Sequence, residues 1–322
     1  MAALALSFLL LGGGRLAAQD ADPPLSDLAV RLAAMTAVTG YEQRMVDSLL
    51  ALLPGAVRDR AGNAVVVLGG GERRRLAACP VSEPGFVVGG VRDDGWMTLR
   101  RAPGRVSPVV ERQLEGQRVT VLGRRGPVPG VIGVRSIHLT RGRGTAGEGA
   151  FTVDSAYLDI GAATSADVAA AGIEILSPLA LAKRPQRYGP DLLAAPVAAR
   201  RTACAALLLA ARRAIAEQGM VPRGESVVIA FVVEQDLLGR GLATVASTRG
   251  PFSETVVVDG GPGTPGAVMR GADTLAARWP ALGTVTRWSL GGRYMATAVE
   301  TTSLGGADSL RAALAQWIGG AR

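Results

Sequence analysis

This chain of 322 residues contains only one histidine, His138, and only one lysine, Lys183. Because imidazole is the commonest metal ligand and the commonest general base in proteins, a site that needs several histidines is excluded. Aromatic residues make up 4% of the chain, which leaves few rings on which nucleic-acid bases could stack. The two cysteines allow no more than one internal disulfide and do not by themselves establish it.

Positive charge is abundant, but it is carried almost entirely by arginine. The formal net charge of +8 would ordinarily suggest nucleic acid or an anionic surface as a partner. Alanine, glycine, arginine and valine dominate the whole chain, so a biased composition accounts for the charge without a ligand. The arginines are scattered, and the nearest thing to a patch consists of Arg100, Arg101, Arg124, Arg125, Arg141 and Arg143. We therefore expect no nucleic-acid partner.

The N-terminus has an apolar run, Ala2 to Leu11, followed by Ala17-Ala18 and then by polar residues and prolines. The run has the length of a signal peptide and is too short to anchor a protein across a bilayer, although it lacks a basic segment before it. We expect a secretory signal cleaved after Ala18, a secreted or periplasmic protein, and no membrane association after cleavage. The alternative is a buried N-terminal helix in a cytoplasmic protein.

Most of the chain alternates between helical periodicity and short apolar strands. This alternation predicts an α/β fold, with a mixed or parallel sheet that helices flank on both faces. Between Gly85 and His138 the pattern changes to short strands separated by glycine and proline, which indicates an inserted small β-barrel or sandwich. The predicted units are a signal and linker (1–24), the α/β domain (25–81 and 155–322) and the small β domain (82–154).

One strand ends in a run of polar side chains that is typical of a hydrolytic site. The sequence VVIAFVVEQDLLGRGL begins at Val227, runs as an apolar strand into Glu234, Gln235 and Asp236, and then reaches a glycine turn. A hydrolytic site in an α/β protein presents its carboxylates in this way, at the end of a buried strand. Here, however, the middle position is a glutamine.

Several segments, taken in order, resemble one family, the tetrahedral (TET-type) dinuclear metalloaminopeptidases. This family includes glutamyl and leucyl aminopeptidases and proteins once labelled cellulase M. The resemblance covers residues 25 to the C-terminus, and it implies a phosphorylase/aminopeptidase-like α/β domain interrupted by a small β domain used in homo-oligomer assembly. The matching segments are Val38 to Glu42, Asp59 to Asn63, Ser82 to Val88, Gly130 to Gly133 with His138-Leu139, Asp159 to Ala162, Ala199 to Cys204, Glu234 to Gly241, Asp259 with Thr264 to Gly266, and Arg293 to Met295.

The resemblance implies a site with two divalent metals, Zn or Co, in which the paired ions lower the pKa of a bridging water. The first histidine of the family and the aspartate two residues later fall on Pro80 and Ser82. The bridging aspartate falls on Ala199, and the last histidine falls on Ala296. None of these four side chains can replace the ligand that the family has at its position.

The paired glutamates of the family fall on Gln235 and Asp236. Gln235 keeps the shape of the general base, but its neutral amide cannot accept a proton. Only Asp236 and Asp259 remain as plausible ligands, and two carboxylates without imidazoles are too few for a dinuclear centre. We expect no cofactor, whereas two Zn or Co ions would be needed if the family activity survives.

Other residues near these positions leave alternatives open. The resemblance places His138 in the small domain, with a structural or interface role. It places Cys79 and Cys204 beside Pro80 and Ala199, where they form either a disulfide across the former site or, as we expect, buried free thiols. Arg201 matches an arginine of the family, whereas Arg200 is extra. Our hypothesis is that one of these guanidinium groups supplies the positive charge of the lost metals; the alternative is that both arginines face solvent or the small domain.

Three functions are compatible with this sequence. The first is a catalytically degenerate aminopeptidase homologue that is exported and acts as a binding or assembly module, with a peptide as its potential ligand. The second is an active metallo-aminopeptidase with a relocated or single-metal site built from Asp236, Asp259 and either Glu234 or Glu83. The third is a non-enzymatic subunit of a hetero-oligomer.

Overall fold

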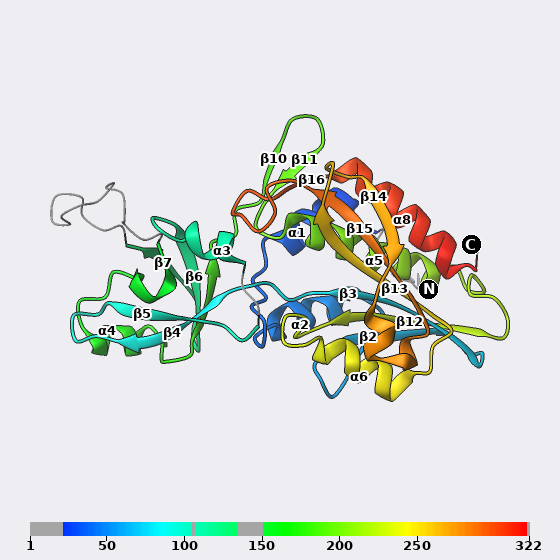
Figure 1. The fold of residues 1–322 in the computed structure, drawn as a ribbon, viewed down its shortest axis with the longest axis horizontal. Coiled ribbons are helices and arrows are strands. Elements are labelled where there is room, and N and C mark those ends of the chain that lie inside the picture. Colours follow the sequence, from blue (N-terminus) through cyan, green and yellow to red (C-terminus); the bar gives the residue numbers. More distant parts are fainter. Residues whose placement is uncertain (1–21, 105–106, 134–150, 321–322) are drawn as a thin grey trace, which may run out of the picture.

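The computed structural model describes residues 22–104, 107–133 and 151–320. His138 and nearly all of the predicted signal segment lie outside these residues. The described chain forms an α/β domain and a small β-barrel that lies at one end of it (Figure 1).

A seven-stranded sheet forms the centre of the α/β domain. Its four inner strands run parallel, and each strand added at the two edges is antiparallel to its neighbour, so the sheet is mixed as predicted. In spatial order the strands are β1 (Val57–Arg58), β2 (Ala64–Gly69), β12 (Glu225–Val232), β3 (Arg73–Pro80), β13 (Glu254–Pro262), β15 (Thr284–Gly292) and β14 (Val268–Ala272). The middle of β12 and of β13 is a continuous apolar run, as is typical of strands buried on both faces.

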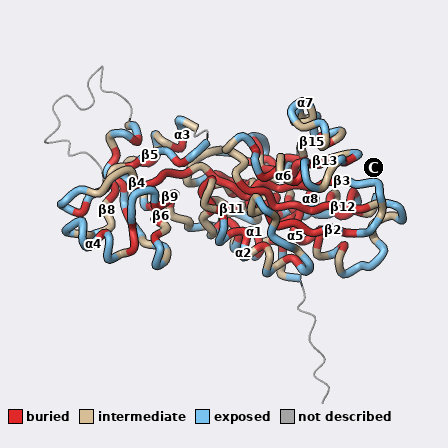
Figure 2. The backbone as a smooth tube through the Cα atoms, turned by 90° about the horizontal axis from the view of Figure 1, so that it is seen from below, coloured by how far each residue is buried: buried red, intermediate tan, exposed pale blue. Residues whose placement is uncertain are grey.

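Helices cover both faces of this sheet, which confirms the predicted fold class. Successive residues of a strand point to opposite faces, so Val66 packs against one layer of helices and Val65 against the other. The first layer contains α1 (Leu25–Ala33), α2 (Gln43–Leu52), α5 (Ala198–Ala216) and α8 (Leu304–Ile318). The second contains α6 (Arg240–Arg249), α7 (Leu275–Arg278) and the short η2 (Pro280–Leu282). Figure 2 shows the buried strands running between exposed outer turns.

Helix α5 is buried along most of its length and packs against α1, α8 and the sheet. Its small alanine side chains let it approach the strands closely. A Cβ atom at Gly260 of β13 would lie 2.5 Å from the backbone nitrogen of Arg200, so glycine is required where the first turn of α5 meets β13. The N-terminus of α5 is thereby held beside β13, near the residues that carry the predicted site.

The small domain is a closed six-stranded barrel with its own apolar core. The predicted boundary at residue 154 is too early, because two barrel strands follow it. Strand β9 closes the barrel by pairing with both β4 and β6, which the local strand pattern could not reveal. In order around the barrel the strands are β4 (Phe86–Val91), β5 (Met97–Arg101), β8 (Tyr157–Asp159), β7 (Gly126–Ile132), β6 (Arg118–Gly123) and β9 (Pro178–Leu181); the helices of this domain are α3 (Pro108–Arg112), η1 (Val153–Ser155) and α4 (Ser165–Ala170).

A three-stranded antiparallel sheet connects the barrel to α5. It consists of β10 (Gln186–Tyr188), β11 (Leu192–Ala194) and β16 (Thr301–Ser303), and β16 follows the loop that contains Ala296. Within the described residues, no helix has both the length and the apolar character needed to cross a membrane.

Candidate functional site at the ends of the parallel strands

The predicted site residues gather where parallel strands of the sheet end. Ser82 follows β3, Gln235 and Asp236 follow β12, and Asp259 belongs to β13. The carboxyl ends of parallel strands lie at the same edge of a sheet, and this edge is where α/β proteins usually place their sites.

Arg200 and Asp259 form the central ion pair of this site. The Arg200 Nε atom donates to Asp259 Oδ1 over 2.8 Å, and Arg200 Nη1 donates to the backbone carbonyl oxygen of Ser82 over 2.7 Å. The second oxygen of Asp259 accepts from Arg287 Nη1 over 3.0 Å. Both carboxylate oxygens of Asp259 are therefore engaged by guanidinium groups.

The pKa of Arg200 reports the charges around it. Burial by itself lowers this pKa, but the negative charges of Asp259, Asp236 and Glu300 and the hydrogen bond to Asp259 raise it above the ordinary arginine value. Arg200 therefore remains a cation at every physiological pH.

Asp236 has different partners. Its Oδ2 atom accepts a hydrogen bond of 3.0 Å from the Thr39 hydroxyl. Gly104 of the barrel domain approaches so closely that a Cβ atom there would lie 2.8 Å from the Cβ of Asp236. The two remaining acidic ligand candidates are thus held by separate sets of neighbours.

Ser82 and Glu42 hold the backbone that carries Gln235. The Ser82 hydroxyl donates to Glu42 Oε1 over 2.7 Å and accepts from the Gln235 backbone nitrogen over 3.0 Å. The same Glu42 oxygen accepts from the Glu234 backbone nitrogen over 2.8 Å. Burial raises the pKa of Glu42 above its ordinary value, although these hydrogen bonds oppose the shift. The side-chain oxygen of Gln235 is buried and has no hydrogen-bond partner in the described structure.

Glu300 bridges the two alanines that stand at ligand positions. Its Oε1 atom accepts from the Ala199 backbone nitrogen over 3.0 Å, and its Oε2 atom accepts from the Ala296 backbone nitrogen over 3.2 Å. Burial raises the pKa of Glu300, while these hydrogen bonds and the charge of Arg200 oppose the shift. Sequence reasoning missed Glu300 because its partners are backbone groups, one of them 101 residues away.

Arg201 points away from Asp236 and Asp259 and belongs to a second buried cluster. Its guanidinium lies 3.6 Å from Glu83 Oε2 and donates to the carbonyl oxygen of Val81. Glu83 also forms an ion pair with Lys183 and accepts from the Ala37 backbone nitrogen over 2.7 Å. Burial, with a contribution from the charge of Arg201, lowers the pKa of Lys183, although Glu83 opposes the shift.

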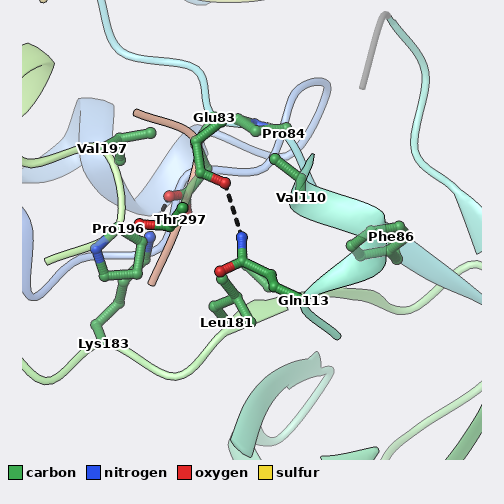
Figure 3. Close-up of a pocket in the computed structure, with 12 residues that line it drawn as sticks. Glu83, Pro84, Phe86, Val110, Gln113, Leu181, Lys183, Pro196, Val197 and Thr297 are labelled. Atoms are coloured by element: carbon green, nitrogen blue, oxygen red, sulfur yellow. Dashed lines mark hydrogen bonds and ion pairs between the residues drawn. The ribbon is translucent and has the colours of Figure 1, made fainter. Parts of the chain in front are cut away.

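Glu83 and Lys183 also line a pocket between the barrel and the α/β domain (Figure 3). Its walls are mainly apolar and include Phe86 and Leu181 from the barrel and Val197 from the start of α5. Gln113 on the barrel side donates to the carbonyl oxygen of Ala296 over 2.7 Å, which holds the loop around this predicted ligand position.

Cys79 of β3 and Cys204 of α5 form a disulfide, so the expectation of free thiols is wrong. The two cysteines are 125 residues apart in sequence, and only the packing of α5 on β3 brings them together. Cys204 lies one helical turn after Arg200, so the disulfide joins β3 to α5 directly beside the site.

Comparison with known proteins identifies the family. Residues 62–274 match the family model of the M42 glutamyl aminopeptidases. The chain belongs to the M42 family. A putative aminopeptidase of Escherichia coli (strain K12), SgcX, is 30% identical over 179 residues, which is 53% of this chain and 46% of the relative. The matched region thus spans about half the length of that curated relative.

Several solved structures share the fold of this chain. The TET1 peptidase of Pyrococcus horikoshii superimposes with a TM-score of 0.77 at 18% identity, covering 91% of this chain and 99% of its own. The aminopeptidase APDkam598 of the archaeon Desulfurococcus kamchatkensis gives 0.72 at 17% identity, covering 91% and 96%. The resemblance to TET-type aminopeptidases inferred from the ordered segments is confirmed.

M42 enzymes are metal-dependent peptidases, but the residues at this M42 site do not fit a metal pair. Pro80, Ala199 and Ala296 have no ligand atoms in their side chains, and Asp259 is engaged by two arginines. Across residues 22–104, 107–133 and 151–320, no three His, Cys, Asp or Glu side chains are grouped to hold a metal. Glu234 and Glu83, the further ligands of the single-metal alternative, are paired with Arg240 and Lys183.

Proposed function

We propose that this protein is a catalytically degenerate M42 homologue that keeps the aminopeptidase fold without its dinuclear metal site and acts as a binding or assembly module. The observation that carries the proposal is the arrangement around Asp259. This carboxylate is the best-placed surviving ligand candidate, and Arg200 and Arg287 occupy both of its oxygens.

The chemistry of peptide hydrolysis supports this proposal. A metal-dependent peptidase needs a cation to lower the pKa of a water and polarise the scissile carbonyl, and it needs a base to accept the proton. Gln235 stands at the position of the base, and an amide does not accept a proton at physiological pH. Alanines stand at two ligand positions, and their backbone nitrogens are bound by Glu300. On this proposal the site at the strand ends binds a peptide, while its described residues offer no group that would cleave one.

We further infer that the protein works outside the cytoplasm, in a secreted or periplasmic location. The disulfide between Cys79 and Cys204 supports this inference, because disulfides persist in oxidising compartments and are rare in reducing ones. The apolar N-terminal run is consistent with export.

Assembly into a homo-oligomer through the barrel is the third part of the proposal. The ring of Trp96 meets the ring of Tyr157 on the barrel surface, and these residues remain 41% and 37% exposed. Val131 is also exposed, on the adjacent strand β7. Exposed apolar groups that cluster in this way are typical of contact surfaces. The P. horikoshii TET1 peptidase can assemble into a tetrahedron or a large octahedral shell.

Metal content and activity together test the central proposal. We expect protein purified without exposure to a chelator to contain only traces of Zn and Co, as measured by inductively coupled plasma mass spectrometry. We also expect it to release no N-terminal residues from a panel of peptides, with an active M42 enzyme as the positive control. About two equivalents of metal per chain together with peptide cleavage would overturn the proposal. Co-purification of an intact homologue would instead favour a hetero-oligomeric subunit.

A further inference from the structure

Two buried carboxylates lie at the first turn of α5: Asp259 contacts the guanidinium of Arg200, and Glu300 accepts a hydrogen bond from the backbone nitrogen of the preceding residue, Ala199. Asp259 and Glu300 are 5% and 2% exposed. Partly buried carboxylates of like charge repel one another and lose hydration, and they need a compensating positive charge.

Arg200 also connects chain segments that are far apart in sequence. Its Nε and Nη2 atoms reach the two oxygens of Asp259 on β13 at 2.8 and 3.5 Å. Its Nη1 atom binds the carbonyl oxygen of Ser82, directly after β3. One side chain on α5 thereby joins the ends of two sheet strands, which is what a metal shared between ligands from several strands would do.

The position on the helix makes this role specific to Arg200. The close packing of Gly260 against the first turn of α5 brings Arg200 directly against β13. The next residue, Arg201, is rotated by about 100° around the helix and meets Glu83 instead. Arg287 reaches Asp259 as well, but it is also bound to Asp273, so it does not supply its charge to this cluster alone.

We propose that Arg200 is a tethered cation that takes over the structural role of a bound divalent metal, neutralising the buried carboxylate of Asp259 and holding α5 to the ends of β3 and β13. This inference rests on the proposed function, because it assigns the lost metal site a new structural role in an inactive homologue. An ordinary buried ion pair would stabilise the fold as well. If Arg200 acts as a tethered cation, a free cation should in addition be able to replace it.

Cation rescue of Arg200→Ala tests this prediction. The variant keeps the acidic side chains and removes the guanidinium, so we expect a lower melting temperature than the wild type. We expect Mn²⁺ or methylguanidinium to restore part of the loss in the variant and to leave the melting temperature of the wild type unchanged. Mn²⁺ is the appropriate metal probe because the remaining donors are carboxylate oxygens. Absence of rescue by both cations, or equal stabilisation of the wild type, would overturn the inference.

Two further variants control the experiment. Arg213→Ala removes an exposed arginine from the same helix, where it pairs with Glu217, and we expect neither cation to stabilise it. Arg200→Ala combined with Asp259→Asn removes one of the carboxylates, and we expect it to lose the Mn²⁺ response. If Arg200→Ala does not fold, Arg200→Gln takes its place, because its amide can still donate to Asp259 while leaving the acidic cluster uncompensated. The same Mn²⁺ response is expected of it, and its absence would equally overturn the inference.

The failure of this inference can be told apart from the failure of the proposed function. Stoichiometric metal in the wild-type protein would contradict the proposed function. If the wild type is metal-free and inactive and neither cation raises the melting temperature of the Arg200 variants, only the tethered-cation inference is contradicted.

Discussion

Two buried glutamates, Glu42 and Glu300, bind the backbone around the candidate site. Glu42 accepts hydrogen bonds from the Ser82 hydroxyl and from a backbone nitrogen after β12, and Glu300 accepts them from the backbone nitrogens of Ala199 and Ala296. Burial raises the pKa of both glutamates, because the charged carboxylate is less stable in the protein interior than it is in water. The hydrogen bonds they accept offset part of that cost.

The raised pKa of Glu42 gives a pH dependence with a definite sign. Because the pKa is raised on folding, the protonated carboxyl group of Glu42 stabilises the folded state. Its contribution to the unfolding free energy is complete below the ordinary pKa of 4.5 and is lost as pH rises through the folded-state pKa. Glu42→Gln removes this titration, while its amide oxygen can still accept from Ser82 and from the Glu234 backbone. We expect the unfolding free energy of the variant, relative to the wild type, to rise between pH 4 and neutrality.

Urea unfolding of both proteins across this pH range measures the difference. Parallel pH curves for the two proteins would show that Glu42 contributes no such dependence.

At the scale of secondary-structure elements, the contact between α5 and the sheet positions the site. Helix α5 supplies Ala199, Arg200, Arg201 and Cys204 within two turns, and each of these residues contacts a different part of the structure. The helical repeat explains this division, because successive residues point in different directions while Arg200 and Cys204, four apart, share a face. The first turn of α5 therefore determines how the sheet ends are held.

The disulfide should contribute strongly to the stability of this contact. Its cysteines are separated by 125 residues, and closing a loop of that size restricts the unfolded chain. We expect the double variant Cys79→Ala with Cys204→Ala to lose about 3–5 kcal/mol of unfolding free energy. Urea denaturation under non-reducing conditions measures the loss, and the wild type in dithiothreitol should approach the stability of the variant. A difference below about 1 kcal/mol would show that α5 is held by packing alone.

At the scale of the whole molecule, the barrel is joined to the α/β domain at a buried ion pair. Glu83 precedes the first barrel strand, β4, and Lys183 follows the last one, β9, so the pair lies where the chain enters and leaves the barrel. Separating the partners of a buried ion pair would leave an uncompensated charge in the interior, which is strongly destabilising. The pair therefore resists changes in its geometry. The barrel therefore presents its outer surface in a defined orientation.

That outer surface leads to a prediction about assembly. Trp96→Glu places a charge in the exposed aromatic cluster, so we expect it to shift the protein toward a smaller species in size-exclusion chromatography with light scattering. Val57→Glu is the matched control, because Val57 is exposed on the α/β domain at the edge of the sheet. A monomeric wild type, or an assembly unaffected by Trp96→Glu, would argue against a contact through this part of the barrel.

Sequence patterns were enough to predict the fold class and the family, and they motivated the proposal that the catalytic groups are missing. Alternating apolar strands and amphipathic helices are local patterns, and the single histidine and the glutamine at position 235 are matters of composition and identity. The tertiary structure alone decided the disulfide, the closure of the barrel by β9, the role of Glu300 and the choice of Arg200 over Arg201 as partner of Asp259. The physical reason is that these contacts join side chains and backbone groups distant in sequence, and local periodicity carries no information about which distant groups will meet.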